Sequence, residues 1–192
     1  MSMGSASQTR RQRGYAWERT IARRFQKEGW KAVRLGSPSI ELPDVMAVSD
    51  RFSTIFAIEA KSGAGTTLYV PRDQVFRCID WVRMFGKYTH REFILAFKFL
   101  GKKRMADGTH VARERKEYFF TGTRWWIDYF NESEIDTIAC TYEGETYGIA
   151  KGERVHDERM QMGCPFNNPA DKRVHTYEML SLGLPGGIPL AT

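Results

Sequence analysis

The stretch STIFAIEAK, residues 53–61, decides the fold, because it joins a buried strand to two charged side chains. The apolar run at residues 55–58 predicts a β-strand in the core. Side chains alternate between the two faces of a strand, so Glu59 and Lys61 project together near its C-terminal end. A carboxylate and an ammonium on an otherwise apolar face indicate a functional edge of a sheet.

Two further carboxylates are expected at the same edge. The stretch DVMAVS, residues 44–49, predicts a neighbouring strand, and the turn after it makes the two strands an antiparallel hairpin. In a hairpin of this length, Asp44 lies beside Glu59. Residues 14–29 predict a helix on whose inward stripe Glu18 falls, in line with Ile21. Glu18, Asp44, Glu59 and Lys61 therefore converge.

Three carboxylates cannot share a small site comfortably as anions, and a divalent cation resolves the repulsion. Carboxylate oxygens are ligands of Mg²⁺, for which Mn²⁺ can substitute. A bound metal polarises a phosphate and activates water, while Lys61 orients that water or stabilises developing charge. Taken singly, a Glu-x-Lys pair or an Asp after Pro43 is usually structural. The coincidence of three elements favours phosphodiester hydrolysis.

Composition narrows the class of protein. The chain has 192 residues, a net charge of +6 and a pI near 9.3, which puts nucleic acid slightly ahead of a basic surface without a specific partner. It contains neither a run of 18 apolar residues nor an apolar N-terminal segment, so we expect no membrane span and no signal peptide. Three widely spaced cysteines indicate a reducing compartment. We therefore expect a cytoplasmic protein, associated with the nucleoid if its partner is DNA. Cysteine and histidine spacing matches no usual zinc site.

The remaining pattern predicts strands at residues 30–35, 68–70, 91–99 and 117–122, and a second helix at 72–86. The apolar surface of that helix is wider than one side of a sheet usually buries, so we expect a second chain to bury the rest. Residues 100–116 form a basic connector with a turn at Asp107–Gly108. We expect a flexible basic arm at 1–13, a nuclease domain at 14–130, and a loosely structured C-terminal extension of unknown role at 131–192.

The order of motifs resembles a known family. Pro43–Asp44 followed by EAK at 59–61 is similar to the PD-(D/E)xK nuclease signature, which alone is weak. The wider series GYAWER, GWKAVRLGSPS, PDVMAV, IEAK, LYVPRDQ and FILAFKF resembles the archaeal-type Holliday junction resolvases over about residues 13 to 125. This resemblance implies an α/β restriction-endonuclease-like fold, in which helices flank a mixed central sheet, and an archaeal or viral-type host. It also implies a homodimer that cuts four-way DNA junctions.

The resemblance also implies residue roles. Glu18, Asp44, Glu59 and Lys61 are similar to the family's catalytic groups, and the Ala60 carbonyl joins the three carboxylates as a metal ligand. The DNA-contacting candidates are the following basic and polar residues: Arg10, Arg11, Arg13, Arg19, Arg34, Ser37, Ser39 and Gln74. The long basic connector and the extension depart from the family pattern, which bears on junction selectivity.

Two alternatives stay open at this point. One is another duplex- or flap-cutting PD-(D/E)xK nuclease on the same fold. The other is a DNA-binding scaffold without turnover, which the presence of all four candidate catalytic residues disfavours.

Overall fold

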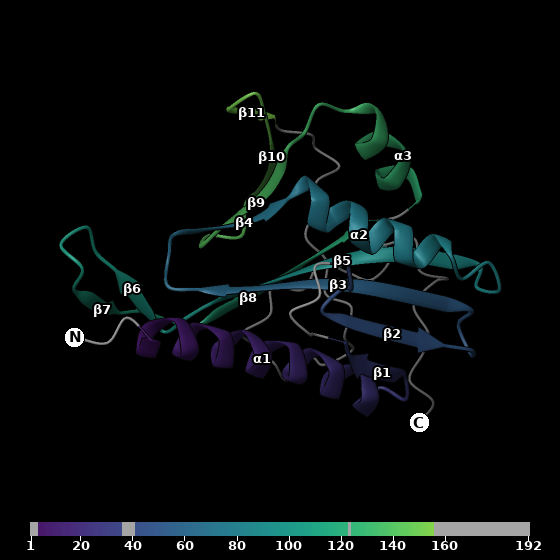
Figure 1. Ribbon diagram of the computed structural model, residues 1–192, viewed down its shortest axis with the longest axis horizontal. Helices are drawn as coiled ribbons and strands as arrows, with labels where there is room; N and C mark the ends of the chain where they lie inside the picture. The colour runs from purple at the N-terminus through teal and green to yellow at the C-terminus, as the bar shows by residue number, and fades with distance from the viewer. Residues whose placement is uncertain (1–3, 36–40, 123, 156–192) are drawn as a thin grey trace.

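The computed structural model describes residues 4–35, 41–122 and 124–155 (Figure 1). Its main sheet has five strands in the order β1-β2-β3-β5-β8. These are β1 (Lys31–Arg34), β2 (Val45–Ser49), β3 (Thr54–Gly63), β5 (His90–Phe99) and β8 (Lys116–Gly122). Strands β3 and β5 run parallel, and the other neighbours are antiparallel, so the predicted mixed sheet and the β2–β3 hairpin are confirmed.

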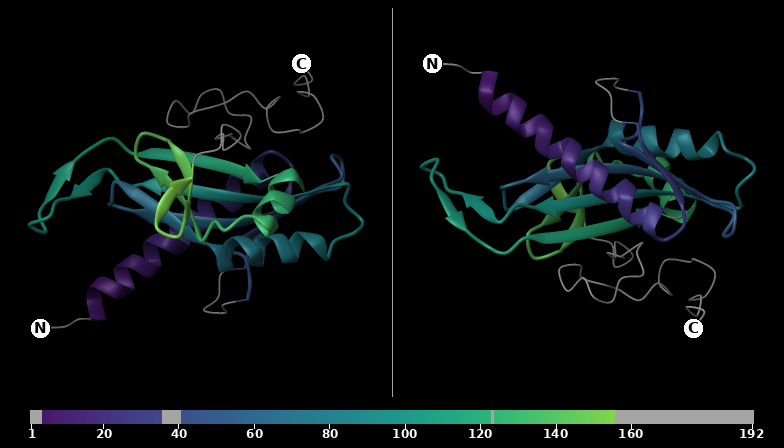
Figure 2. Two further views of the ribbon diagram at one scale, coloured as in Figure 1. Left: turned by 90° about the horizontal axis from the view of Figure 1, so that it is seen from above. Right: turned by 90° about the horizontal axis from the view of Figure 1, so that it is seen from below.

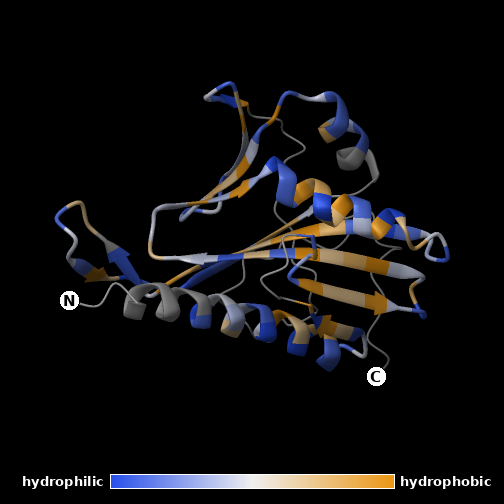
Figure 3. Cartoon of the chain, viewed as in Figure 1, coloured by the Kyte–Doolittle hydropathy of each residue, from blue (hydrophilic) through white to orange (hydrophobic). Residues whose placement is uncertain are grey.

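Helices cover both faces of this sheet, as predicted for the fold class. Helix α1 (Gly4–Lys27) buries Trp17, Ile21 and Phe25 against one face. Helix α2 (Arg72–Arg83) packs Val75 and Ile79 on the other. Figure 3 shows that apolar residues dominate the central strands between the two layers. Within the described ranges, none of the helices combines the length and hydropathy needed to cross a bilayer.

The start of α1 corrects the predicted flexible arm. Residues 4–13 continue the helix, because this stretch contains no proline and consists largely of residues compatible with a helix, such as Ala6, Gln8 and Gln12. Its polarity predicts exposure to solvent rather than absence of structure. The helix ends at Lys27, and Gly29 then takes a left-handed backbone with φ of 80°.

The parallel pair β3 and β5 requires a crossover, which runs through β4 (Thr67–Pro71) and α2. Strand β4 leaves the main sheet and joins a second one, ordered β11-β10-β9-β4. Its partners are β9 (Thr137–Thr141), β10 (Thr146–Ala150) and β11 (Glu153–Val155). The predicted loose extension is therefore wrong for residues 137–155. Those strands are short, so their alternation is hard to recognise without β4 beside them.

The same region covers part of α2, for which a second chain was expected. Phe76 of α2 packs on Phe130 of α3 (Arg124–Glu132), with ring centroids 5.7 Å apart. Arg72 donates hydrogen bonds to the carbonyls of Phe130 and Ser133 at 2.8 and 3.0 Å. The chain thus supplies some of this cover itself. Met84 remains 65% exposed just after the helix.

The basic connector forms a hairpin of β6 (Lys102–Arg104) and β7 (His110–Ala112). Its turn lies at Asp107–Gly108, as predicted, where Gly108 has a φ of 83° and Asp107 accepts a hydrogen bond from the Thr109 amide. Figure 2 shows that this hairpin and the N-terminal half of α1 extend from the same end of the molecule and diverge.

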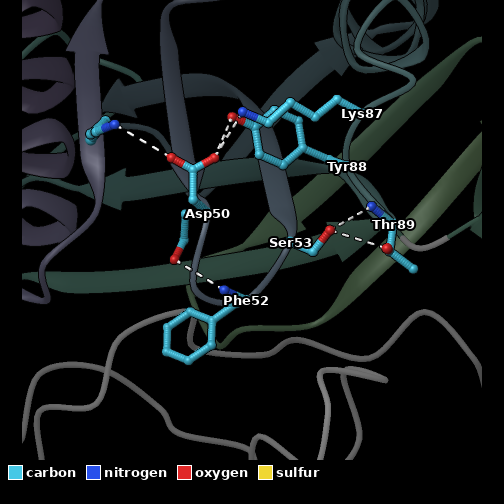
Figure 4. A network of polar contacts seen from close by, with 8 residues as sticks. Asp50, Phe52, Ser53, Lys87, Tyr88 and Thr89 are labelled. Atoms are coloured by element: carbon cyan, nitrogen blue, oxygen red, sulfur yellow. Dashed lines mark hydrogen bonds and ion pairs between the residues drawn. The ribbon is translucent and has the colours of Figure 1, made fainter.

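The opposite end of the sheet is held by a polar network at the β2–β3 turn (Figure 4). Asp50 pairs with Lys87 at 3.1 Å and accepts a hydrogen bond from the Tyr88 hydroxyl at 3.3 Å. The Ser53 hydroxyl accepts a hydrogen bond from the Thr89 amide at 3.0 Å. These contacts join the hairpin turn to the segment that enters β5.

Candidate active site at the sheet edge

Glu59 is the most buried charged group of the site. It lies on β3, with 2% of its side chain exposed, and both carboxylate oxygens are engaged. Lys61 donates to Oε1 at 2.6 Å, and Arg77 of α2 donates to Oε2 at 2.8 Å. Because an unpaired charge at this depth would cost several kcal/mol, about 3–5 by analogy with other buried pairs, the two cations keep Glu59 in place.

Asp44 lies beside Glu59, as the hairpin predicts. Its Oδ2 accepts a hydrogen bond from the Ala60 amide at 2.8 Å, which links the start of β2 to the middle of β3. Burial, and after it the negative charges of Glu59 and Glu18, raise the pKa of Asp44 to about 7, against the opposing effects of the Ala60 hydrogen bond and of Lys61. Asp44 therefore lies within electrostatic reach of both other carboxylates.

Glu18 enters the site from α1, from the inward stripe that the sequence predicts. Only 6% of the residue is exposed, and Arg34 donates to its Oε2 at 2.6 Å. The Arg34 guanidinium also lies over the Tyr15 ring, 4.1 Å from its centroid. Arg34, a candidate for DNA contact, thus neutralises a buried carboxylate from the neighbouring strand β1.

The donor set fits a hard divalent cation in its chemistry. Besides burial, the negative charges of Glu59 and Glu18 raise the pKa of Asp44, and a cation would relieve that repulsion. In the part of the chain that the structure describes, no three Asp, Glu, His or Cys side chains are arranged to hold a metal ion. Glu18 and Glu59 are instead paired with cations of the protein itself.

The predicted DNA-contacting residues are placed differently from one another. Arg13 and Arg19 are exposed on α1. Gln74 lies in the first turn of α2, and its Oε1 is buried without a hydrogen-bond partner among the described residues. The side chains of Arg10 and Arg11, together with Ser37 and Ser39, lie outside the described part of the chain.

Arg77 is the site residue that the sequence reasoning missed. In the sequence it falls on the narrow polar side of the second helix, with Asp80 and Arg83. Its spacing of three from Gln74 is a signal that could have found it, because residues i and i+3 share a helix face. Helix α2 packs against β3, and Arg77 reaches Glu59 from it.

A family model described as archaeal Holliday junction resolvase (Hjc) matches residues 9–121. One similar solved structure is Hjc of Archaeoglobus fulgidus, a Holliday junction resolvase from an archaeal hyperthermophile. It is 22% identical, with a TM-score of 0.45, and the match covers 68% of this chain and 85% of that one. A search of curated proteins finds no significant match.

Proposed function

The chain belongs to the archaeal Holliday junction resolvase family, and from this premise we propose that it hydrolyses DNA with Mg²⁺ at the edge formed by Asp44, Glu59 and Lys61. As a member of that family it is a structure-selective endonuclease of four-way DNA junctions, in a family that uses divalent metal. To this family activity the proposal adds the identity of the metal ion, Mg²⁺, and the residues that carry out catalysis. The observation that carries it is the electrostatic coupling of Asp44 to Glu59, Glu18 and Lys61, from three separate elements.

Glu18, Asp44, Glu59 and the Ala60 carbonyl are the proposed ligands of Mg²⁺, with Mn²⁺ as a substitute. When bound, the ion polarises the scissile phosphate and lowers the pKa of an attacking water. Glu18 and Glu59 must then exchange contacts with Arg34 and Lys61 for contacts with the ion. Arg77 can stay on Oε2 of Glu59 and hold the carboxylate in position during this exchange.

Lys61 is the group of the chain that faces the reacting phosphate in this proposal. It projects from the same face of β3 as Glu59, and 26% of its side chain is exposed. Its ammonium can donate a hydrogen bond to the attacking water and stabilise the negative charge that develops on phosphate oxygens. Its contact with Glu59 would be released in the exchange, and three donors on a flexible stem would then allow it to reach both the water and a phosphate oxygen.

DNA contact is proposed for the exposed basic and polar groups around this edge. The candidates remain Arg10, Arg11, Arg13, Arg19, Arg34, Ser37, Ser39 and Gln74. The case for DNA contact is weakest for Arg34, because its guanidinium already forms an ion pair with Glu18. Residues 14–130 supply every proposed catalytic group, so we retain that range as the catalytic part of the chain, with residues 131–155 packed against it.

A homodimer is also proposed, working on DNA in the cytoplasm in association with the nucleoid. Met84 and Phe85 follow α2, and both are exposed apolar side chains that a second copy would cover. A dimer presents two equivalent sites, which suits paired cuts at a symmetrical junction. Mass measurement by light scattering tests this directly, and a monomeric mass at micromolar protein, with and without a junction, would contradict it.

The activity is tested with a labelled four-way junction and a linear duplex of the same sequence, each incubated with Mg²⁺ or with a chelator. We expect paired, symmetrical nicks in the junction only, and only with metal. Glu59→Gln should bind the junction but not cut it. Asp80→Asn, on the exposed side of α2, is the matched control and should cut normally.

The same experiment separates the alternatives. If the protein cuts linear duplex as well as the junction, it is another nuclease of the same fold and not a junction resolvase. Tight binding without any cleavage by the wild type, unchanged by Glu59→Gln, would identify a non-catalytic scaffold.

A further inference from the structure

A groove of about 580 Å³ lies on the α1 side of the main sheet, next to the catalytic edge. Its walls are α1, the ends of β3 and β5, and the base of the β6–β7 hairpin. Trp17 and Leu100 contribute apolar surface to its lining. None of its lining residues belongs to the proposed metal-binding set, so the groove is separate from that site.

The groove carries positive charge that the protein does not neutralise. Its basic lining residues are Arg13, Lys98, Lys102 and Arg115, and none of its lining residues is acidic. Lys98 is paired with Glu117 at 3.0 Å. The other three are exposed, and no carboxylate within the described ranges pairs with them. Such a surface attracts an anion with several charges in a row.

Arg115 is kept at this groove by the shape of the backbone. Gly101 lies directly under its side chain, and a Cβ at Gly101 would come within 3.3 Å of the Arg115 Cγ and Nε atoms. The Gly101 carbonyl also accepts a hydrogen bond from the Arg113 amide at 3.1 Å, which fixes the base of the hairpin. A glycine here therefore lets Arg115 lie across the hairpin and line the groove.

The groove lies close to the proposed reaction along two elements. Ser62 lines it and directly follows Lys61, on the opposite face of β3. On α1, Arg13 precedes Glu18 by five residues, which corresponds to roughly 7–8 Å along the helix axis. Phosphates of one DNA strand advance about 3.4 Å per nucleotide along the duplex. A duplex lying along α1 at the catalytic edge would therefore present to the groove the phosphates about two nucleotides from the cut.

We propose that this groove binds the DNA backbone at the phosphates about two nucleotides from the scissile one, through Arg13, Lys102 and Arg115. The inference rests on the proposed function and deepens it, because it adds a backbone-binding site built partly from the β6–β7 hairpin. The contacts are to phosphate, so they fix the register of the strand and do not read its sequence.

The first test compares the variant Lys102→Gln/Arg115→Gln with the control Arg51→Gln/Arg83→Gln. The control removes two exposed charges: Arg51 directly follows Asp50 in the β2–β3 turn, and Arg83 ends α2, four residues before Lys87. Binding to a labelled four-way junction is measured by fluorescence anisotropy without divalent metal, at several salt concentrations. Loss of two phosphate contacts per protomer should make the slope of log K against log salt shallower by about two for each bound protomer, or about four for the proposed dimer. The control should keep the slope of the wild type.

The second test uses the wild-type protein, so folding of a variant is not at issue. Single phosphates on the cut strand are replaced by uncharged methylphosphonates, one position at a time. We expect weaker binding for the position about two nucleotides from the cut. In Lys102→Gln/Arg115→Gln the same replacement should cause no further loss, because the contact is already gone.

The outcomes distinguish this inference from the proposed function. If the wild type binds and cuts the junction, but neither the variant nor any methylphosphonate within about four nucleotides of the cut weakens binding, the groove does not bind the backbone. If the control variant lowers the slope as much as the groove variant, the effect is one of net charge, and the assignment is also overturned. If the wild type neither binds nor cuts junctions, the proposed function itself fails.

Discussion

Arg77 donates a hydrogen bond to Oε2 of Glu59 at 2.8 Å, from a helix that follows β3 by way of β4. Both side chains are largely removed from solvent, with 13% and 2% exposed. The contact therefore joins the crossover helix to the strand that carries the proposed metal ligand. The position of the Glu59 carboxylate and the packing of α2 therefore depend on each other.

Arg77→Gln should lower the free energy of unfolding of the metal-free protein by about 1–3 kcal/mol, because Glu59 keeps Lys61 but loses its second cation. Urea unfolding monitored by tryptophan fluorescence measures the change. Arg83→Gln, an exposed arginine of the same helix, should change stability by less than about 0.5 kcal/mol. Adding Glu59→Gln to Arg77→Gln should recover part of the loss, and a strictly additive double variant would contradict the coupling.

Lys61→Gln should slow single-turnover cleavage of a saturating junction by about 10²–10³-fold, because the transition state loses a charged hydrogen-bond donor. Glu59 stays held by Arg77, so junction binding should change little. Quenched-flow cleavage of a labelled junction, with binding measured separately, gives both quantities. Lys87→Gln, remote from the edge, serves as the control, and an equal loss of rate in that variant would exclude a catalytic role for Lys61.

Asp44→Asn should stabilise the metal-free protein above pH 7, while abolishing cleavage. The pKa of Asp44 rises from 3.8 to about 7 on folding, so the folded state binds the extra proton between these values. Stability then falls as pH rises through that window, by up to about 2 kcal/mol after allowing for partial exposure. Thermal unfolding at pH 5 and pH 8 measures this difference.

Mg²⁺ should make the wild type more stable to heat than Asp44→Asn at pH 8, which reverses their order without metal. An ion that binds only the folded state raises the melting temperature of the wild type with concentration. Asp44→Asn should show little of this increase, whereas Asp80→Asn should respond like the wild type. A melting temperature of the wild type that is insensitive to Mg²⁺ and Mn²⁺ would argue against the proposed ligands.

Glu92 offers a pH dependence that is separate from the active site. It is buried in β5, its Oε2 has no hydrogen-bond partner in the described residues, and burial raises its pKa from 4.5 to about 7. The folded state therefore binds the extra proton between these values, and stability falls as pH rises from 4.5 toward 7. Glu92→Gln should remove this decline, gaining up to about 3 kcal/mol at pH 8 relative to the wild type.

The matched control is Glu153→Gln, at an exposed position of β11, which should leave the pH profile of unfolding unchanged. Chemical unfolding at pH 5, 6, 7 and 8 provides the profile. If Glu92→Gln and the wild type change in parallel across this range, Glu92 is not the group responsible.

The central strands were predictable because each is a long apolar run that a single sheet must bury. Glu59 and Lys61 interrupt such a run on one face, and that interruption carries most of the information about the candidate site. Asp44 followed from hairpin geometry, which the register of Val45 opposite Ile58 confirms. Glu18 followed from its place on the inward stripe of α1, and its burial confirms that place.

The features that were missed depend on contacts between distant parts of the chain. Strand β9 has only five residues, and its burial arises from pairing with β4 far earlier in the sequence. Arg77 looks like any helical arginine until the end of β3 is placed beneath it. The basic N-terminal residues gave no apolar stripe, so helical continuity there was hidden by polarity.

The pairing of β4 with β9 also sets an order of events during synthesis. Thr67 pairs with Thr141, so the seventy residues 72–141 must follow β4 before its edge is closed. At about 5–20 residues per second, that edge stays open on the ribosome for roughly 4–15 s. The unpaired backbone N–H and C=O groups of an open strand edge can form hydrogen bonds with other chains. The nascent enzyme therefore passes through an interval of aggregation risk that ends only when its later strands arrive.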